Sequence, residues 1–429
     1  MMRNLIILSI LAYGAVAYGQ DFHRCYTHES MQAYEETNPG YLAGVNEAFE
    51  RAKAHESFDR STVYNVKVVF HVVYNTPEEN LADSVILNQL DALNADYRRL
   101  NADTTEMRDT FQTIVGDSYI QFELATIDPW GNPTTGITRT ETDETSFLDF
   151  GGGGGIAEGV KSTSTGGIDP WDQEHYLNIW ICDMSLFGSP FVLGYATPPD
   201  GLPHWPAGST AGMSDGVVLQ YEFVGSNNPN VVDLGSGPVD VRGRTCTHEV
   251  GHYLGLRHIW GDGDCTEEDG VDDTPNADDQ SNQDCDTTKN TCTDAIGTLG
   301  DLPDMVENYM DYSAETCQNS FTLGQIDIMR GVLEVQRIEL INFNPVLGVP
   351  SQPTAQWSVY PNPSNGENIT ISGLSGEETT IQVYNEAGQI VQEFVTSDEL
   401  INFELESKGI FIVKVLEAGN TSVKRLIVI

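Results

Sequence analysis

Three histidines at fixed spacing constrain this 429-residue chain most strongly: His248, His252 and His258, in a segment that also holds Glu249 and Gly255. Side chains four apart on a helix project from one face, so the first two histidines can bind one metal ion. Gly255 lets the chain leave the helix, which allows His258 to approach as a third ligand. Three nitrogen ligands leave a tetrahedral zinc ion one open position, as in catalytic sites. Glu249 can then act as general base on a zinc-activated water.

The composition is strongly acidic. Asp and Glu outnumber Lys and Arg by 64 to 21, which gives a formal net charge of -43. Nucleic acid and anionic membranes would be repelled, so we exclude both as partners and expect cationic partners or bound cations. Hydrophobic residues make up 39% of the chain, which is enough to build folded cores.

The N-terminus has the pattern of an export signal. Arg3 precedes an apolar run from Leu5 to Ala17, and small residues follow at Ala17 and Gly19. We predict a signal peptide over residues 1–19. A membrane-spanning helix needs about 20 apolar residues, so we expect no span in the mature protein. Disulfides can persist in an exported protein.

The remaining chain divides into segments of different character. Residues 20–60 are polar and acidic with weak helical signals around 41–54, and we interpret them as a propeptide. Residues 61–344 mix strands and helices and predict an α+β domain with a mixed twisted sheet. The main expected elements are strands at 63–74, 120–125 and 176–184 and helices starting at 83 and spanning 323–339. A Pro-rich linker over 345–354 precedes short alternating strands over 355–429, which suggest a small β-sandwich.

A second motif lies about fifty residues after the histidines, at Asn308–Tyr312. Together with the zinc motif it resembles the Met-turn of the metzincin metallopeptidases. The resemblance implies that Met310 forms a hydrophobic floor beneath the zinc ligands. It also implies that the Tyr312 hydroxyl stabilises the oxyanion formed during peptide hydrolysis.

Further residues resemble the pappalysin family of metzincins over roughly 64–337. They are His258–Asp262, Asp273–Pro275 and the strand Tyr176–Trp180. The resemblance implies a secreted zinc endopeptidase that acts on proteins or peptides. It also implies that the strand around 178–184 forms the upper rim of the cleft, where substrate adds as an antiparallel strand.

The stretch 262–315 is acidic, and Lys289 is its only basic residue. Hard oxygen ligands of the kind that calcium prefers are offered by Asp269, Asp272, Asp273 and Thr274. Pappalysins bind calcium in this loop, so the resemblance implies a structural Ca²⁺ ion. The alternative is a solvated acidic surface.

Seven cysteines leave at least one thiol without a partner in the chain. Four lie in the acidic region and allow three pairings. The family resemblance implies Cys265–Cys292 and Cys285–Cys317. The remaining two in the catalytic region, Cys182 and Cys246, either pair or are two buried thiols.

The odd cysteine, Cys25, lies in the expected propeptide. Its thiolate could take the fourth zinc position and displace the catalytic water, with Arg24 anchoring the segment in the acidic cleft. The sequence loosely resembles the cysteine-switch segments of latent metzincins, so we predict a latent proenzyme. The alternatives are a stray thiol or a disulfide to Cys182 or Cys246. Removal of the segment is expected near Arg51 or Arg60.

Residues 357–429 resemble a type IX secretion sorting domain. The resemblance rests on Val359–Ser364, Tyr384–Gly388, Gly409–Val415 and the basic-apolar end Lys424–Ile429. It implies export through the type IX secretion machinery. The alternative is a carbohydrate- or surface-binding β-domain.

Three functions compete on this sequence. A secreted zinc endopeptidase leads, and an inactive metal-binding or adhesive protein on the same scaffold is the alternative. A zinc amidase acting on non-peptide substrates is the third. The presence of Glu249 favours an active enzyme. Relatives prefer a basic residue after the scissile bond, read by an acid just before the last loop cysteine. Thr316 stands there and Glu315 lies one step away, so we expect a weakened basic preference.

Overall fold

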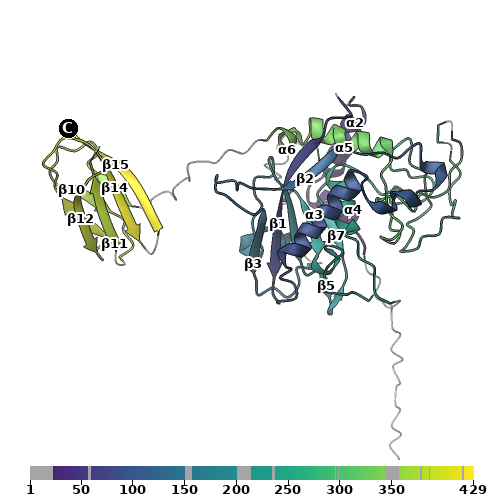
Figure 1. Cartoon of the computed structure of the whole chain (residues 1–429), viewed down its shortest axis with the longest axis horizontal. Coiled ribbons are helices and arrows are strands. Elements are labelled where there is room, and N and C mark those ends of the chain that lie inside the picture. The colour runs from purple at the N-terminus through teal and green to yellow at the C-terminus, as the bar shows by residue number, and fades with distance from the viewer. Residues whose placement is uncertain are drawn as a thin grey trace, which may run out of the picture. The chain divides into compact units, whose positions relative to one another are not determined.

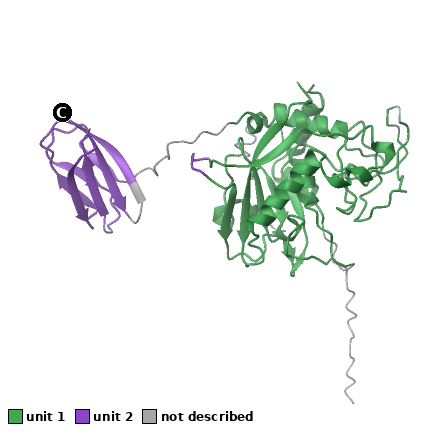
Figure 2. Cartoon of the chain, viewed as in Figure 1, with its two compact units in different colours: residues 1–128, 134–344 green, residues 129–133, 345–429 purple. Residues whose placement is uncertain are grey.

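A computed structural model describes most of the chain, namely residues 23–56, 59–149, 157–200, 214–233, 237–294, 296–297, 299–343, 357–376, 379–385, 387–417 and 420–429. The expected signal peptide (1–19) and linker (345–354) lie outside these residues. The chain divides into two compact units, residues 1–128 with 134–344 and residues 345–429 with 129–133 (Figure 2).

The first unit is built on a mixed sheet in the order β2-β1-β4-β8-β7, with β3 also paired to β1. The strands are β1 (Tyr64–Tyr74), β2 (Ile120–Leu124), β3 (Ile137–Glu141), β4 (Leu177–Cys182), β7 (Gly194–Ala196) and β8 (Val217–Gln220). All pair in parallel except β7, which runs antiparallel to β8 and ends the sheet. The short hairpin of β5 (Ser185–Leu186) and β6 (Ser189–Pro190) precedes β7.

The sheet is covered on both faces. Along β1, Val68 and Phe70 belong to the main core cluster, whereas Val69 and Val73 pack on the opposite face. This two-sided burial explains why the sequence of β1 is almost continuously apolar. In Figure 1, α3 (Asp83–Tyr97) and α4 (Arg244–Tyr253) lie side by side.

The other helices of this unit are α1 (Thr27–Thr37), α2 (Tyr41–Lys53), α5 (Leu323–Val335) and α6 (Ile338–Asn342). Thr322 and Gln325 form the expected capping box at the start of α5. Helix α2 packs closely on α5: a Cβ at Gly331 would lie 2.4 Å from the carbonyl oxygen of Ala52. Short 3-10 helices connect these elements, namely η1 (Ala102–Glu106), η2 (Asp109–Phe111), η3 (Glu158–Lys161), η4 (Thr163–Thr165) and η5 (Tyr221–Phe223).

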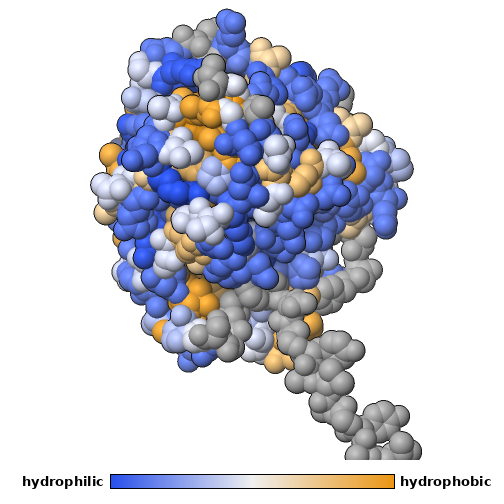
Figure 3. All heavy atoms as spheres, turned by 90° about the vertical axis from the view of Figure 1, so that its right-hand side faces the viewer, coloured by the Kyte–Doolittle hydropathy of each residue, from blue (hydrophilic) through white to orange (hydrophobic). Residues whose placement is uncertain are grey.

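The segment between α4 and α5 has little regular structure in its described residues and is held by two disulfides. Cys265 is joined to Cys292 and Cys285 to Cys317, the pairing that the family resemblance implies. Cys25, Cys182 and Cys246 are free and buried. Figure 3 faces the side on which this segment lies, and hydrophilic residues dominate that surface.

The second unit consists of antiparallel strands in two sheets, β13-β10-β9 and β12-β11-β14-β15. The strands are β9 (Ser358–Tyr360), β10 (Ile369–Ser372), β11 (Thr379–Tyr384), β12 (Ile390–Thr396), β13 (Leu400–Phe403), β14 (Gly409–Glu417) and β15 (Asn420–Val428). Its core cluster draws on Ile371, Ile381 and Val413 from both sheets. The expected fold class, an α+β domain followed by a small all-β sandwich, is therefore confirmed.

One expectation about the sheet is wrong. The strand predicted to form the rim of the cleft, around 178–184, is β4, which lies between β1 and β8 with all six residues buried. A strand with neighbours on both sides has no free edge on which to bind a peptide. Helix α1 was also absent from the sequence prediction. No helix in the described part of the chain is long and apolar enough for a membrane crossing.

Candidate metal centre and active site

Helix α4 carries the first two histidines, and both of its ends are fixed by identifiable contacts. At its start, the Glu315 carboxylate accepts hydrogen bonds from the backbone N–H groups of Arg244 (3.2 Å) and Thr245 (2.9 Å). A carboxylate there satisfies free N–H groups and complements the helix dipole. After the helix, Gly255 has a φ of 91° and approaches Val332 closely, so a side chain would be strained and crowded there. The chain then turns back toward the helix.

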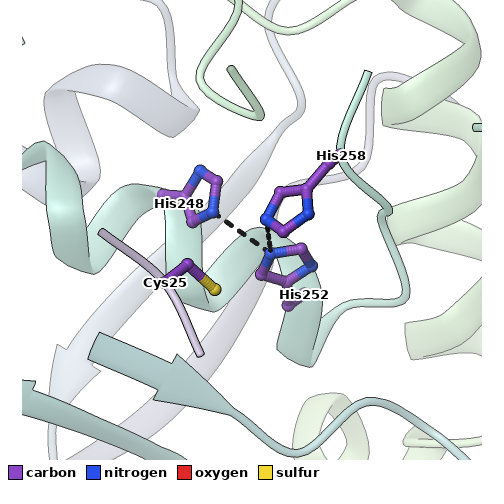
Figure 4. A group of neighbouring side chains, drawn as sticks. All are labelled: Cys25, His248, His252 and His258. Atoms are coloured by element: carbon purple, nitrogen blue, oxygen red, sulfur yellow. Dashed lines mark hydrogen bonds between the residues drawn. The ribbon is translucent and has the colours of Figure 1, made fainter. Parts of the chain in front are cut away.

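This turn brings His258 to the histidines of α4. The Nε2 atom of His252 lies 3.1 Å from Nε2 of His248 and 3.0 Å from Nε2 of His258 (Figure 4). All three residues are buried. The Cys25 sulfur points toward the three imidazoles. This sulfur and one nitrogen of each histidine all lie within 4.8 Å of one another.

The positions of the hydrogens on the three imidazoles show whether His248, His252 and His258 can bind a metal ion. Each Nδ1 atom donates a hydrogen bond, to the carbonyls of Tyr309 (2.7 Å) and Leu256 (2.8 Å) and to the carboxylate of Asp262 (2.5 Å). A neutral imidazole with its hydrogen on Nδ1 has a lone pair on Nε2. Burial lowers the pKa of His248 and lowers that of His252 to about 3, so both are neutral. Lone pairs facing one another at these distances repel unless a cation lies among them, and this donor set fits zinc.

Glu249 lies beside the histidines and is fully buried. Its Oε2 accepts hydrogen bonds from the Cys25 thiol (3.3 Å) and the Thr27 hydroxyl (3.2 Å), and its Oε1 has no hydrogen-bond partner among the described residues. Burial raises the pKa of Glu249 to about 8, and these hydrogen bonds oppose the rise. A Cβ at Gly194 would lie 2.7 Å from the Glu249 side chain, so a glycine leaves room for the carboxylate at this edge of the sheet.

Met310 packs against α4, and Tyr312 lies beside the histidines. A Cβ at Gly251 of α4 would lie 2.5 Å from the Met310 sulfur, which shows how closely the methionine packs beneath the helix. The Tyr312 ring contacts the rings of His248 and His258. Its hydroxyl donates a hydrogen bond to the carbonyl of Cys25 at 3.1 Å, and burial raises its pKa, so it remains a donor.

The residues around Cys25 pair with the outer edge of the sheet near Glu249. The backbone N–H of His23 donates to Phe191, that of Leu193 donates to His23, and that of Tyr26 donates to Gly194, at 2.7, 3.1 and 3.0 Å. The pairing of His23 with Val192 is parallel. The residues that can bind a peptide strand are therefore 191–196 rather than 178–184.

The side chain of Arg24 is buried in the lower part of the cleft. It donates hydrogen bonds to the carbonyl of Ser313 and to Oε1 of Gln318 (2.8 Å). Burial lowers the pKa of Arg24, while the charges of Glu315 and Asp311 raise it. Among the described residues, the Glu315 carboxylate accepts hydrogen bonds from the start of α4 and none from Arg24, and Thr316 stands where relatives have the acid that reads a basic side chain.

The four residues suggested as calcium ligands are not equivalent. The Oδ2 of Asp269 and the Oδ1 of Asp273 are buried and have no hydrogen-bond partner among the described residues. Thr274 lies close by, and burial raises the pKa of Asp269. Asp272 points outward, with a side chain 87% exposed and an ion pair to Lys53. Asp269 and Thr274 line a cavity of about 280 Å³.

Several residues that shape the histidine site could not be identified from the sequence. The carbonyls of Leu256 and Tyr309 orient two histidines, and a backbone oxygen carries no mark in the sequence. Asp262 belongs to the family pattern His258–Asp262, but that pattern does not indicate its hydrogen bond with Nδ1 of His258. Gly194 could have been found only by knowing which strand ends the sheet.

Comparisons with known proteins agree with this geometry. The family described as pregnancy-associated plasma protein-A matches residues 167–334, and the secretion system C-terminal sorting domain matches residues 358–429. An extracellular metalloprotease of Arthroderma benhamiae is 29% identical over 297 residues, which cover 68% of this chain and 80% of that protein.

Two solved structures from Tannerella forsythia are similar to the first unit. A promirolysin mutant is 34% identical with a TM-score of 0.62, over 75% of this chain and 97% of that one. Mature mirolysin in complex with a cleaved peptide is 36% identical with a TM-score of 0.54, over 66% and 96%. The site, the sheet and these relatives together identify the chain as a secreted zinc metalloendopeptidase that belongs to the pappalysin family.

Proposed function

We propose that the matured chain hydrolyses peptide bonds of extracellular proteins, with His248, His252 and His258 holding zinc and Glu249 acting as general base. The observation that carries this proposal is the Glu249 carboxylate, buried beside three imidazoles whose Nε2 lone pairs converge. Zinc, when bound, supplies a Lewis acid that polarises a carbonyl and makes water more acidic. Glu249 would take the proton of the attacking water and pass it to the leaving amine.

We propose that the Tyr312 hydroxyl stabilises the oxyanion that forms during peptide hydrolysis. Its hydroxyl already donates to a backbone carbonyl beside the histidines, that of Cys25. A scissile carbonyl at this place would receive the same hydrogen bond, which strengthens as negative charge develops on the oxygen. The test of the whole assignment is cleavage of an extended fluorogenic peptide by the matured chain, compared with its Glu249→Gln variant. An adhesive or merely metal-binding protein would show no cleavage in either case.

The latent form is proposed to be held by Cys25. Burial raises the pKa of its thiol, and the Glu249 charge raises it further, so a thiolate would need a cation beside it. A zinc ion held by the three histidines would supply that charge. The segment also runs parallel to residues 191–194, whereas an antiparallel substrate would run the other way. The blocking chain therefore presents its peptide bonds in the wrong direction for cleavage.

We propose the following segments: a signal peptide (1–19), a propeptide (20–60), the peptidase domain (61–344), a linker (345–354) and a sorting domain (355–429) that directs type IX export. Of the two maturation sites, Arg60 is favoured. Both side chains are exposed, but Arg51 lies within α2 beside Ala52, which is packed on Gly331, whereas Arg60 lies outside any helix or strand. Sequencing the N-terminus of the matured protein tests this choice.

A structural calcium ion is proposed at Asp269, Asp273 and Thr274. Two buried carboxylate oxygens that have no hydrogen-bond partner in the described part of the chain support it, because buried charges require a counter-charge. Calcium takes several oxygen ligands of this kind.

We predict that calcium raises the melting temperature of the zinc-loaded protein. At a free concentration about 100 times the dissociation constant, binding adds about 2.7 kcal/mol. This corresponds to roughly 4–5 °C for a domain of this size. Asp269→Asn should abolish the increase, whereas Asp286→Asn, a change to an exposed acid of the same segment, should keep it. A melting temperature that a calcium-selective chelator leaves unchanged would count against the ion.

The position of Arg24 supports a proposal about specificity. If substrate pairs antiparallel to residues 191–196 with its scissile bond beside Glu249, the residue after that bond takes the place of Arg24. Its surroundings are the Ser313 carbonyl and the Gln318 amide oxygen, and the charges of Glu315 and Asp311 act on it without a direct ion pair among the described residues. Neutral oxygens bind a guanidinium less strongly than a paired carboxylate does.

We therefore predict a moderate preference for arginine after the scissile bond, of about tenfold over leucine in kcat/KM. Gln318→Ala should remove most of it, since a hydrogen bond to a charged group contributes about 1.5–3 kcal/mol. Cleavage of the leucine peptide is the internal control and should stay within about twofold. Strict arginine specificity, or a preference for acidic residues, would contradict the assignment.

A further inference from the structure

A buried carboxylate outside the histidine cluster joins three parts of the catalytic unit. Asp96 lies near the end of α3 and is 5% exposed. Its Oδ2 accepts a hydrogen bond from the Thr247 hydroxyl at 2.8 Å, and its Oδ1 accepts one from the Tyr309 hydroxyl at 2.8 Å. Asp96 thereby connects α3 both to α4 and to the Met-turn segment.

Both partners of Asp96 are immediate neighbours of one histidine. Thr247 directly precedes His248 on α4. The carbonyl of Tyr309 accepts the Nδ1 hydrogen of His248 at 2.7 Å. One side chain thus holds the residue before His248 and the residue that orients its imidazole.

The charge of Asp96 has a partner, although not a tight one. The Arg244 guanidinium lies 3.6 Å from Asp96 and 2.7 Å from Asp103. Burial raises the pKa of Asp96 to about 6, and Arg244 opposes the rise. A buried charged network of this kind contributes little net stability compared with a well-packed apolar side chain. The effect of this network is instead to fix the relative positions of α3, α4 and the Met-turn segment.

We propose that Asp96 is a positioning residue that fixes the orientation of His248 toward the metal. The inference rests on the proposed role of His248 as a zinc ligand. Asp96 fixes the rotation of α4 about its axis through the hydrogen bond to Thr247. Through the hydrogen bond to Tyr309 it fixes the position of the carbonyl that orients His248. Groups that hydrogen-bond a metal ligand directly change metal affinity or activity by about 10–100-fold when they are removed. Asp96 acts through Tyr309 and Thr247, one hydrogen bond further from the metal, so we expect the lower end of this range.

The test is the zinc affinity of the full-length chain at 25 °C, measured by competition with a chelating dye. Asp96→Ala should weaken zinc binding by about tenfold. Thr247→Val and Tyr309→Phe each remove one hydrogen bond to Asp96 and should have smaller effects. Both effects should disappear in the Asp96→Ala background, because the shared acceptor is already gone. Asp96→Asn, which keeps the shape and one acceptor oxygen, should restore part of the affinity.

The matched control is Gln89→Leu. Gln89 is also buried on α3, donates to the Gly243 carbonyl at 2.9 Å and accepts from the Gly225 N–H at 2.8 Å. It therefore ties α3 to the residue before α4 without touching Thr247 or Tyr309. We expect a lower melting temperature for this variant, with zinc affinity within about twofold of the wild type.

Two outcomes would overturn the proposal. If Asp96→Ala and Asp96→Asn both bind zinc within twofold of the wild type, while melting lower as Gln89→Leu does, Asp96 has only a structural role. If the wild-type chain itself binds no stoichiometric zinc, the proposed function fails as well. The first result leaves the zinc site intact, so the two failures can be told apart.

Discussion

Replacing Glu249 by glutamine should leave zinc bound and reduce kcat/KM by about 10²–10⁴-fold, which is the range that general-base catalysis contributes. Glutamine has nearly the same shape, so the space beside Gly194 stays filled and the three imidazoles keep their places. The amide cannot accept the proton of the attacking water. The measurement is hydrolysis of a fluorogenic peptide by protein freed of its propeptide with an added protease, together with the zinc content.

The control for this experiment is Glu267→Gln. Glu267 lines the same pocket as His252 and His258, but its side chain is exposed, whereas Glu249 is buried. The same loss of one negative charge near the cleft should change the rate by less than about twofold. Near-normal cleavage by zinc-loaded Glu249→Gln would contradict the assigned role, and equal losses in both variants would point to a general effect of charge.

The histidine site could be predicted from the sequence because its determinants are local. Two ligands four residues apart, a general base between them and a glycine after them fix most of the geometry within eleven residues. The third ligand returns because Gly255 adopts a positive φ, which the residue type itself suggests. Nothing far along the chain is needed to bring these side chains together.

The rim of the cleft could not be predicted in the same way. Residues 177–182 have the alternating and apolar pattern of any buried strand, and only the pairing with β1 and β8 decides that β4 is internal. The edge segment around Gly194 is short and its sequence is unremarkable as a strand. Edge position is a property of the assembled sheet, so a single strand's pattern carries no information about it.

The acidic side chains illustrate the same limit on a smaller scale. In sequence, Asp269 and Asp272 are similar residues in one loop, yet one is buried with an unpaired oxygen and the other points to solvent. Glu315 lies one step from the position at which relatives read a basic side chain, and in the structure it accepts hydrogen bonds from N–H groups of the first turn of α4. Which partner a carboxylate meets is decided by tertiary packing.

The largest effect on the latent form is expected from Cys25→Ala. Structural zinc sites contribute about 10–16 kcal/mol, which is roughly 3 kcal/mol for each of four ligands. Losing one ligand should therefore raise the activity of the unprocessed chain about a hundredfold. The backbone pairing of His23 and Tyr26 with residues 191–194 and the burial of Arg24 remain, so activity should stay below that of the matured enzyme. The measurement is the initial rate of peptide cleavage, with mass spectrometry to establish that the chain is intact.

Cys182→Ala is the matched control, because it also removes a free buried thiol, but one that lies on the internal strand β4. It should leave the proform latent, although the cavity in the core will lower its stability. Early activity in both variants would mean that loosening of the fold, rather than loss of the thiolate, opens the cleft. Unchanged latency of Cys25→Ala would mean that the strand pairing and Arg24 suffice. Because the segment lies parallel to residues 191–194, it would then block the cleft without a thiolate, and maturation would open the cleft by removing that paired segment together with Arg24.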